Sequence, residues 1–423
     1  MILTRSEQIG VIACPGAEKF TEDLISNLQN IYIKRYNKTV DSISRRYGLE
    51  RDEIIQRINL TSEFSSMKKP HVTDITKFKS PQYRIPVRNT RFANGELKAE
   101  ILESVRGMDL FIIQDCENHY PLEINKGSGQ THNFSVNDHV MMLFATVDAV
   151  MGAGAHSCTL VLPAYPYSRQ HKKKGREALT ASWFGKVCEF MGVHRIITLD
   201  IHSKAIENSF HHLSLENLHA SYQILRELTR LVDVHGEDLV VVSPDTGAVD
   251  RNKFFATSLQ KPLALLYKER DYSRISNNAS DTNITSIKLL GDVAGKIVFM
   301  ADDMLGTGGT LIAAMRVLKS LGADKIICAV SLPLFSGNSL EEFDNAYREG
   351  LFFRIIGTDA VHHEQDLYGK EWYVCARISS LFGETISRLH HGKSLSTLLD
   401  NRKIIQKLLG RAKGPESEQS ESE

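Results

Sequence analysis

Short apolar runs recur along most of this chain, and each is followed by a segment with helical spacing. Continuous rather than alternating apolar residues indicate strands that are buried on both faces. Residues 138–151 and 310–321 have helical periodicity, and Gly322 after the second is suited to a helix C-terminus. Strand–helix alternation predicts an α/β architecture with mostly parallel sheets. The predicted strands are residues 9–14, 110–114, 158–162, 195–199, 239–243, 263–267, 297–301, 325–330 and 353–356.

The length of 423 residues exceeds that of one ordinary domain. Because the predicted strands fall into two groups, we expect two similar doubly wound α/β domains, at residues 1–217 and 218–398. A polar and basic stretch at about 33–87 interrupts the first pattern, and we interpret it as an inserted helical and loop segment on the surface. Residues 399–423 form a C-terminal extension whose end, from residue 414, has the composition of a disordered acidic tail.

The charge balance excludes some classes of partner. Lys+Arg and Asp+Glu both number 51, so the formal net charge is zero, and we expect no nucleic-acid or membrane partner. No stretch reaches the roughly 18 apolar residues of a membrane span, and the N-terminus does not resemble a signal peptide. The six cysteines form no C-x-x-C pair, and we interpret them as buried free thiols. We therefore expect a cytoplasmic protein.

The most informative segment is residues 296–310, where a predicted strand leads into Asp302 and Asp303 and then into a Gly/Thr-rich loop that opens a helix. Small residues let the backbone approach an anion, and the helix start supplies free N–H groups. The two carboxylates would suit sugar hydroxyls or Mg²⁺, although a solvated strand end is the alternative interpretation. The loop lacks the Walker and dinucleotide fingerprints. The candidate phosphate-binding residues are Gly306, Thr307, Gly308, Gly309 and Thr310.

This strand, acid pair and T-G-G-T loop resemble the phosphoribosyl-pyrophosphate loop that type I phosphoribosyltransferases share with ribose-phosphate pyrophosphokinases. The resemblance implies that the loop holds the 5-phosphate of ribose 5-phosphate and that Asp302 and Asp303 contact its hydroxyls. Those two families share a fold, so this motif alone does not separate them. Gly306 stands where the pyrophosphokinases usually have Asp.

A second segment, R-F-A-N-G-E at residues 91–96 with E-S-V-R-G ending at Gly107, is similar to pyrophosphokinases rather than phosphoribosyltransferases. The resemblance implies that Phe92 stacks on adenine and that Asn94 and Glu96 contact it, often across a subunit interface. Taken alone, Phe92 would more often be a core residue.

A third segment, residues 163–176, follows a predicted strand and is basic, which by itself usually means a solvated loop. It is similar to the P-Y-x-R-Q-x-K-K segment of the pyrophosphokinases, which implies that Arg169, Gln170 and Arg176 bind ATP. His171 stands where the family usually has Asp, and the loop is one residue short before Arg176.

Further residues follow predicted strands at positions that match the family. The resemblance implies that His202 and Asp245 hold Mg²⁺, which neutralises phosphate charge. Lys268 and Arg270, followed by a polar stretch at 271–285, resemble a mobile catalytic loop whose cations stabilise charge on the transferred group.

The resemblance as a whole implies a ribose-phosphate diphosphokinase with an ATP-side N-terminal domain. It would transfer the β,γ-diphosphate of ATP to the C1 hydroxyl of ribose 5-phosphate, giving 5-phosphoribosyl 1-pyrophosphate and AMP for nucleotide biosynthesis. It further implies a homo-oligomer built from dimers, as far as a hexamer, with inorganic phosphate as an activator and Ser336 near a regulatory site. Two alternatives stay open: a phosphoribosyltransferase, or a catalytically silent regulatory homologue, for which Gly306, His171 and the insertion argue.

Overall fold

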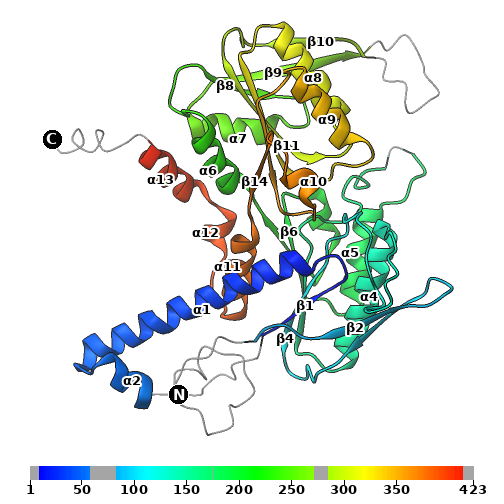
Figure 1. Cartoon of the computed structure of the whole chain (residues 1–423), viewed down its shortest axis with the longest axis vertical. Helices are drawn as coiled ribbons and strands as arrows, with labels where there is room; N and C mark the ends of the chain where they lie inside the picture. The colour runs from blue at the N-terminus through cyan, green and yellow to red at the C-terminus, as the bar shows by residue number, and fades with distance from the viewer. Residues whose placement is uncertain (1–8, 58–81, 174, 271–283, 413–423) are drawn as a thin grey trace. The chain divides into compact units, whose positions relative to one another are not determined.

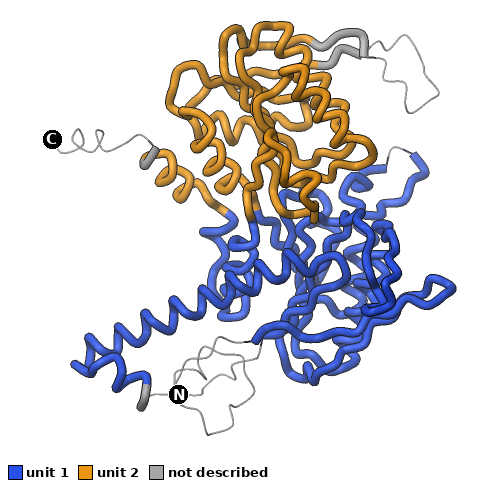
Figure 2. Tube along the Cα trace, viewed as in Figure 1, with its two compact units in different colours: residues 1–218, 378–399 blue, residues 219–377, 400–423 orange. Residues whose placement is uncertain are grey.

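The computed structural model describes residues 9–57, 82–173, 175–270 and 284–412, and within these ranges the side chains of 56–57, 268–270, 284–287 and 411–412 are not described. The chain divides into two compact units (Figure 2): unit 1 comprises residues 1–218 and 378–399, and unit 2 comprises residues 219–377 and 400–423. Over the described ranges, every helix is too short or too polar to cross a bilayer.

Unit 1 is built on a five-stranded parallel sheet (Figure 1). Every residue of its first two strands is buried, as continuous apolar runs predict. In spatial order the strands are β1 (Ile9–Ala13), β4 (Asp109–Ile113), β5 (Ser157–Val161), β6 (Arg195–Leu199) and β7 (Ser214–Leu218).

Helices and a separate hairpin complete unit 1. A capping box at Ser135 and Asp138 starts the helix that packs on β4 and β5. The hairpin consists of β2 (Val87–Arg91) and β3 (Leu97–Ile101). The helices are α1 (Glu18–Tyr47), α2 (Arg51–Arg57), α4 (Val136–Gly152), α5 (Thr180–Phe190), the 3-10 helix η1 (Lys204–Ser209), α11 (Ser379–His390) and α12 (Ser396–Leu399).

Unit 2 is built on a seven-stranded sheet whose described strands pair in parallel, apart from the antiparallel β9–β10 pair. Its strands, in spatial order, are β10 (Ile284–Leu290), β9 (Leu263–Arg270), β8 (Leu239–Ser243), β11 (Ile297–Leu305), β12 (Lys325–Pro333), β13 (Arg354–Thr358) and β14 (Tyr373–Ala376). Its helices are α6 (Ser221–Leu231), α7 (Val249–Leu259), α8 (Gly309–Ser320), α9 (Ser339–Arg348), α10 (Gln365–Tyr368) and α13 (Arg402–Ala412). The mixed α/β class with mostly parallel sheets is confirmed.

The strand order of unit 2 reverses between β8 and β11, because the chain first adds β9 on one side of β8 and later adds β11 on the other. In an open α/β sheet the crevice at such a switch point, outside the carboxyl ends of the strands, is the usual ligand site. In unit 2 the acidic segment and the Gly/Thr loop lie at this switch point, at the carboxyl end of β11.

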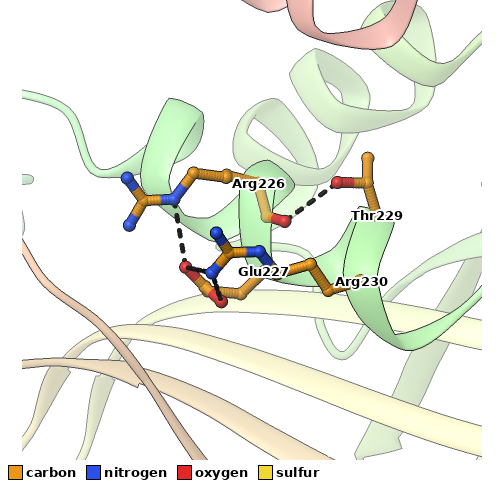
Figure 3. Close-up of polar contacts among 4 residues, drawn as sticks. All are labelled: Arg226, Glu227, Thr229 and Arg230. Atoms are coloured by element: carbon orange, nitrogen blue, oxygen red, sulfur yellow. Dashed lines mark hydrogen bonds and ion pairs between the residues drawn. The ribbon is translucent and has the colours of Figure 1, made fainter. Parts of the chain in front are cut away.

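A buried carboxylate on α6 has its charge balanced within the same helix. Glu227 accepts hydrogen bonds from Arg226 Nε at 3.1 Å and from Arg230 Nη1 at 2.8 and 3.0 Å (Figure 3). Since a buried charge is tolerated when it is paired and hydrogen-bonded, this cluster lets α6 pack on β13 and β14 and is structural.

The two units depart from the expected domain limits in two places. First, α1 runs unbroken for 30 residues, so the expected start of an insertion at about 33 lies inside a helix. Its buried residues continue at i+4 spacing past that point, at Leu24, Leu28, Tyr32, Tyr36 and Val40. Second, residues 378–399 belong to unit 1, because α11 packs against α1.

A buried polar contact links the end of α11 to the start of β4. His390 Nδ1 lies 2.8 Å from Asp109 Oδ2, and Ser157 Oγ donates to Asp109 Oδ1 at 2.7 Å. The side chains of His390 and Asp109 are only 8% and 12% exposed, so the solvent screens this contact little.

Asp109→Asn tests this contact. Burial acts to raise the pKa of Asp109, but the hydrogen bonds from His390 and Ser157 outweigh burial and lower that pKa. A lowered folded-state pKa means that the carboxylate stabilises the fold at neutral pH and loses this contribution as the pH falls through that pKa. We expect the substitution to lower the free energy of unfolding at pH 7 by about 1–3 kcal/mol. Denaturant unfolding followed by circular dichroism, at neutral and at acid pH, measures this loss.

Below about pH 4 the loss should shrink, because the wild-type carboxyl then titrates as well. Glu100→Gln is the control, since it removes an exposed ion pair with Arg88 in the same unit and should change the free energy of unfolding little. An equal loss for Asp109→Asn at both pH values would contradict a role for the charge.

Candidate active site

The acidic pair lies within a strand rather than after one. β11 continues to Leu305, four positions beyond the predicted end at 301, because its pairing with β12 continues to Leu305 opposite Pro333. Asp302 and Asp303 are both half-buried, and the Asp303 N–H donates to Asp302 Oδ1 at 2.8 Å. The pair is therefore held by the sheet itself.

A buried amide separates β11 from β8 directly before the acidic pair. The β8–β11 pairing is recorded only up to Val241 opposite Phe299. Beyond this point, Asn252 of α7 is the hydrogen-bond partner of Ala301 in β11. The Asn252 Nδ2 donates to Ala301 O at 2.8 Å, and the Ala301 N–H donates to Asn252 Oδ1 at 2.9 Å. Asn252 is fully buried, and sequence reasoning missed it, since nothing in the residues of α7 points to a contact with β11.

Three carboxylates influence one another at this edge of the sheet. Burial, then the charge of Asp303 and more weakly that of Asp245, raise the pKa of Asp302 to about 7. Asp245, in the loop after β8, accepts backbone N–H groups of Gly247 and Ala248 on Oδ1, at 2.9 and 3.0 Å. Such a crowded acidic site favours ligands that bring hydrogen-bond donors or positive charge.

The Gly/Thr loop leads directly into α8. Gly308 has φ +80° and caps the helix, and a Cβ there would lie 2.2 Å from a ring carbon of Phe343, so only glycine fits without rearrangement. Thr307, Gly309 and Thr310 are exposed. Because the first N–H groups of a helix have no partner within it, this loop can receive an anion such as phosphate.

Ser336 lies beside this loop, as its N–H donates to the carbonyl of Gly306 at 3.1 Å. The side chain of Ser336 is exposed.

Lys268 and Arg270 have backbones within β9, where Lys268 pairs with Ile287 and Arg270 with Ile284 of β10. Their side chains, and residues 271–283 of the expected catalytic loop, lie outside the described part of the structure.

In unit 1, Phe92, Asn94 and Glu96 lie at the turn of the β2–β3 hairpin. The Phe92 N–H donates to Glu96 O at 2.9 Å, and the Glu96 N–H donates to Asn94 Oδ1 at 3.2 Å. Phe92 is 46% exposed, so the alternative of a core residue is wrong. An aromatic face held at a hairpin turn is available for stacking.

The basic loop follows β5. Tyr167 is in the left-handed region at φ +58°, and its O–H donates to Asn137 Oδ1 at 2.7 Å. Arg169, Gln170 and Arg176 are exposed after this turn. These cationic and amide groups lie where a parallel sheet usually binds its ligand.

His171, in the position where Asp was expected, faces His202, the candidate metal ligand after β6. The ring centroids are 5.1 Å apart, and His171 Nδ1 donates to Ser168 O at 3.1 Å. Partial burial, with the charges of His202 and Lys172, lowers the pKa of His171. The structure thus brings the basic loop that follows β5 close to His202 within unit 1.

Glu117, which sequence reasoning missed, lies after β4 and is close enough to Arg169 for their charges to interact. Burial raises the pKa of Glu117, and the charge of Arg169 acts in the opposite direction. Its position after an apolar strand was the available signal.

Mg²⁺ binds oxygen ligands and is usually held by one or two carboxylates together with substrate phosphates. Asp245, Asp302 and Asp303 supply oxygen donors of this kind, so the donor chemistry fits. Among the described residues, no three His, Cys, Asp or Glu side chains form a metal cage without a substrate.

Comparison with known proteins agrees with this arrangement. Residues 72–192 match the family model for the N-terminal domain of ribose phosphate pyrophosphokinase, and residues 211–365 match that for the phosphoribosyl transferase domain. Ribose-phosphate pyrophosphokinase A of Dictyostelium discoideum is 32% identical over 314 residues, which cover 74% of this chain and 89% of that protein. The ribose-phosphate pyrophosphokinase of Chlorobaculum tepidum is 33% identical over 318 residues, covering 75% and 88%.

The fold is that of a solved relative. The crystal structure of phosphoribosylpyrophosphate synthetase from Mycobacterium smegmatis aligns with 91% of this chain and 100% of its own, at a TM-score of 0.65 and 23% identity. The sequence identities to curated enzymes extend over both units, and the chain belongs to the ribose-phosphate pyrophosphokinase family.

Proposed function

We propose that this chain transfers the β,γ-diphosphate of ATP to the C1 hydroxyl of ribose 5-phosphate, giving 5-phosphoribosyl 1-pyrophosphate and AMP. The observation that carries the proposal is the site of unit 2: an acidic pair within β11 runs into a loop and helix start that can receive phosphate. A phosphoribosyltransferase could use the same site, but it has no need of the exposed aromatic hairpin and basic loop of unit 1.

Ribose 5-phosphate would bind to unit 2. Its 5-phosphate would accept N–H groups of the loop from Gly306 to Thr310, and its hydroxyls would donate to Asp302 and Asp303. The raised pKa of Asp302 supports this assignment, because hydroxyl donors would relieve the repulsion between crowded carboxylates.

ATP would bind to residues of unit 1. The adenine would stack on Phe92 beside Asn94 and Glu96, and the phosphates would contact Arg169, Gln170 and Arg176. The exposure of these side chains supports the proposal, since each is available to a ligand.

In the reaction, the C1 hydroxyl oxygen attacks the β-phosphorus of ATP, and the bond from that phosphorus to the oxygen of the α-phosphate breaks to release AMP. His202 of unit 1 and Asp245 of unit 2 would each hold Mg²⁺, which would neutralise charge on the phosphates. The protein's own residues position the two substrates, and Lys268 with Arg270 would stabilise charge on the transferred group.

Four properties of the chain extend this proposal. All six cysteines are free thiols, which supports a cytoplasmic location. Homo-oligomerisation through dimers, activation by inorganic phosphate and a regulatory role for Ser336 follow from the family resemblance.

The experiment that tests the function is AMP formation by the purified chain with ATP, Mg²⁺ and ribose 5-phosphate, with and without inorganic phosphate. We expect sugar-dependent AMP release together with 5-phosphoribosyl 1-pyrophosphate, identified by mass spectrometry. Binding of ATP without AMP formation would instead support the silent homologue, for which Gly306 and His171 argue. Consumption of 5-phosphoribosyl 1-pyrophosphate with a nucleobase would support a phosphoribosyltransferase.

Asp302→Asn should weaken ribose 5-phosphate binding about tenfold or more, because a charged acceptor of the sugar hydroxyls is lost, and should leave ATP binding unchanged. Calorimetry with each ligand measures both affinities. The matched control is Asp292→Asn, which removes a carboxylate that pairs with Lys296 just before the same strand. Equal losses for sugar phosphate and ATP would contradict the assignment.

Lys268→Ala should lower kcat roughly 10²–10³-fold, because a cation that acts in the transition state is removed, with a small effect on KM. Steady-state kinetics with both substrates measures this split. Lys288→Ala is the control: Lys288 is exposed on β10 and pairs in register with Tyr267, next to Lys268. An unchanged kcat for Lys268→Ala would remove this residue from the proposed mechanism.

A further inference from the structure

The segment that follows β12 forms hydrogen bonds with the start of the Gly/Thr loop, which is called the phosphate loop below. The N–H groups of Leu334 and Phe335 donate to Leu305 O at 2.9 and 3.0 Å, and the N–H of Ser336 donates to Gly306 O at 3.1 Å. Two successive carbonyls at the entrance of the loop are thus held by the backbone of residues 334–336. The position of the loop therefore depends on the position of this segment.

His363 contacts the last residue of β12, Pro333, directly before this segment. Its Nε2 lies 2.6 Å from Pro333 O, and because a carbonyl oxygen only accepts hydrogen bonds, Nε2 carries the proton and donates. His363 is 2% exposed and lies between β13 and α10. A hydrogen bond in such buried surroundings fixes a position more firmly than one in water.

Ring packing connects His363 to the loop by a second route. The His363 and Phe335 rings meet edge to face at 5.8 Å, and Phe335 meets Phe343 in the same way at 5.6 Å. The Phe343 ring in turn lies against Gly308 of the loop. Phe335 has φ +45°, which is costly for a bulky residue, so its surroundings must hold it in place.

We infer that His363 is a positioning residue for the phosphate loop and hence for ribose 5-phosphate. The inference rests on the proposed function, since it assigns the sugar phosphate to this loop. His363 acts through residues 333–336 and the ring packing, and not by touching the substrate. It should therefore affect the affinity for sugar phosphate and leave the affinity for ATP unchanged.

The test compares three variants of the full chain by calorimetry with ribose 5-phosphate and with ATP, each in the presence of Mg²⁺. His363→Leu keeps much of the bulk and removes the donor, and it should weaken ribose 5-phosphate binding about tenfold, with ATP binding unchanged. His363→Gln retains an N–H donor and should restore most of the affinity. His363→Asn has a shorter amide that does not reach Pro333, and it replaces the leucine variant if circular dichroism shows that variant to be unfolded.

The matched control is His235→Leu. His235 Nε2 lies 3.1 Å from Leu409 O, so this variant removes a similar imidazole–carbonyl contact from the same unit, at α13 instead of the loop. It should lower the melting temperature without changing the affinity for ribose 5-phosphate. Equal losses of that affinity in His363→Leu and His235→Leu would reduce His363 to a general stabilising residue.

The outcomes separate this inference from the proposed function. Absence of sugar-dependent AMP formation in the wild type would contradict the proposed function, yet the binding comparison could still be made because calorimetry requires no turnover. Unchanged ribose 5-phosphate affinity in a folded His363→Leu protein would overturn the inference alone. A folded His363→Gln protein that binds no better than His363→Leu would also overturn it, because the donor would then be irrelevant.

Discussion

The paired hydrogen bonds between the Asn252 amide and the backbone of Ala301 are the interaction on which the site of unit 2 depends. The recorded β8–β11 pairing does not reach Ala301, so its polar groups need another partner in a buried setting. By supplying that partner from α7, Asn252 lets β11 continue without β8. The carboxylates that follow can then line the switch point instead of pairing with β8.

On its opposite side, β11 pairs with β12 as far as Leu305. The hydrogen bonds of residues 334–336 to the loop follow directly after this pairing. The end of β11 thus lacks a recorded pairing with β8 on one side and is paired with β12 on the other side. This asymmetry keeps the acids and the helix start in fixed register, and burial together with the charges of Asp303 and Asp245 raises the pKa of Asp302.

The sequence predicted the central strands and the Gly/Thr loop that opens a helix because their signals are local: continuous apolar runs, and glycine and threonine before a helix. It missed β7, β10 and β14, which are sheet-edge strands, and the β2–β3 hairpin, which lies outside both large sheets. In β7 and the hairpin, most residues are half-buried or exposed, so the apolar signal is weak. Asn252 and His363 could not be found, since their partners lie far away in the sequence, whereas Glu117 had one weak signal, its position after an apolar strand.

The return of residues 378–399 to unit 1 means that the chain passes between the units three times. Neither unit is encoded by one continuous stretch of sequence. A gene fragment that ends at residue 218 would leave α1 without α11, and with it the His390 partner of Asp109. Autonomous expression of unit 1 thus calls for a spliced gene, in which a short linker joins residue 218 to residue 378.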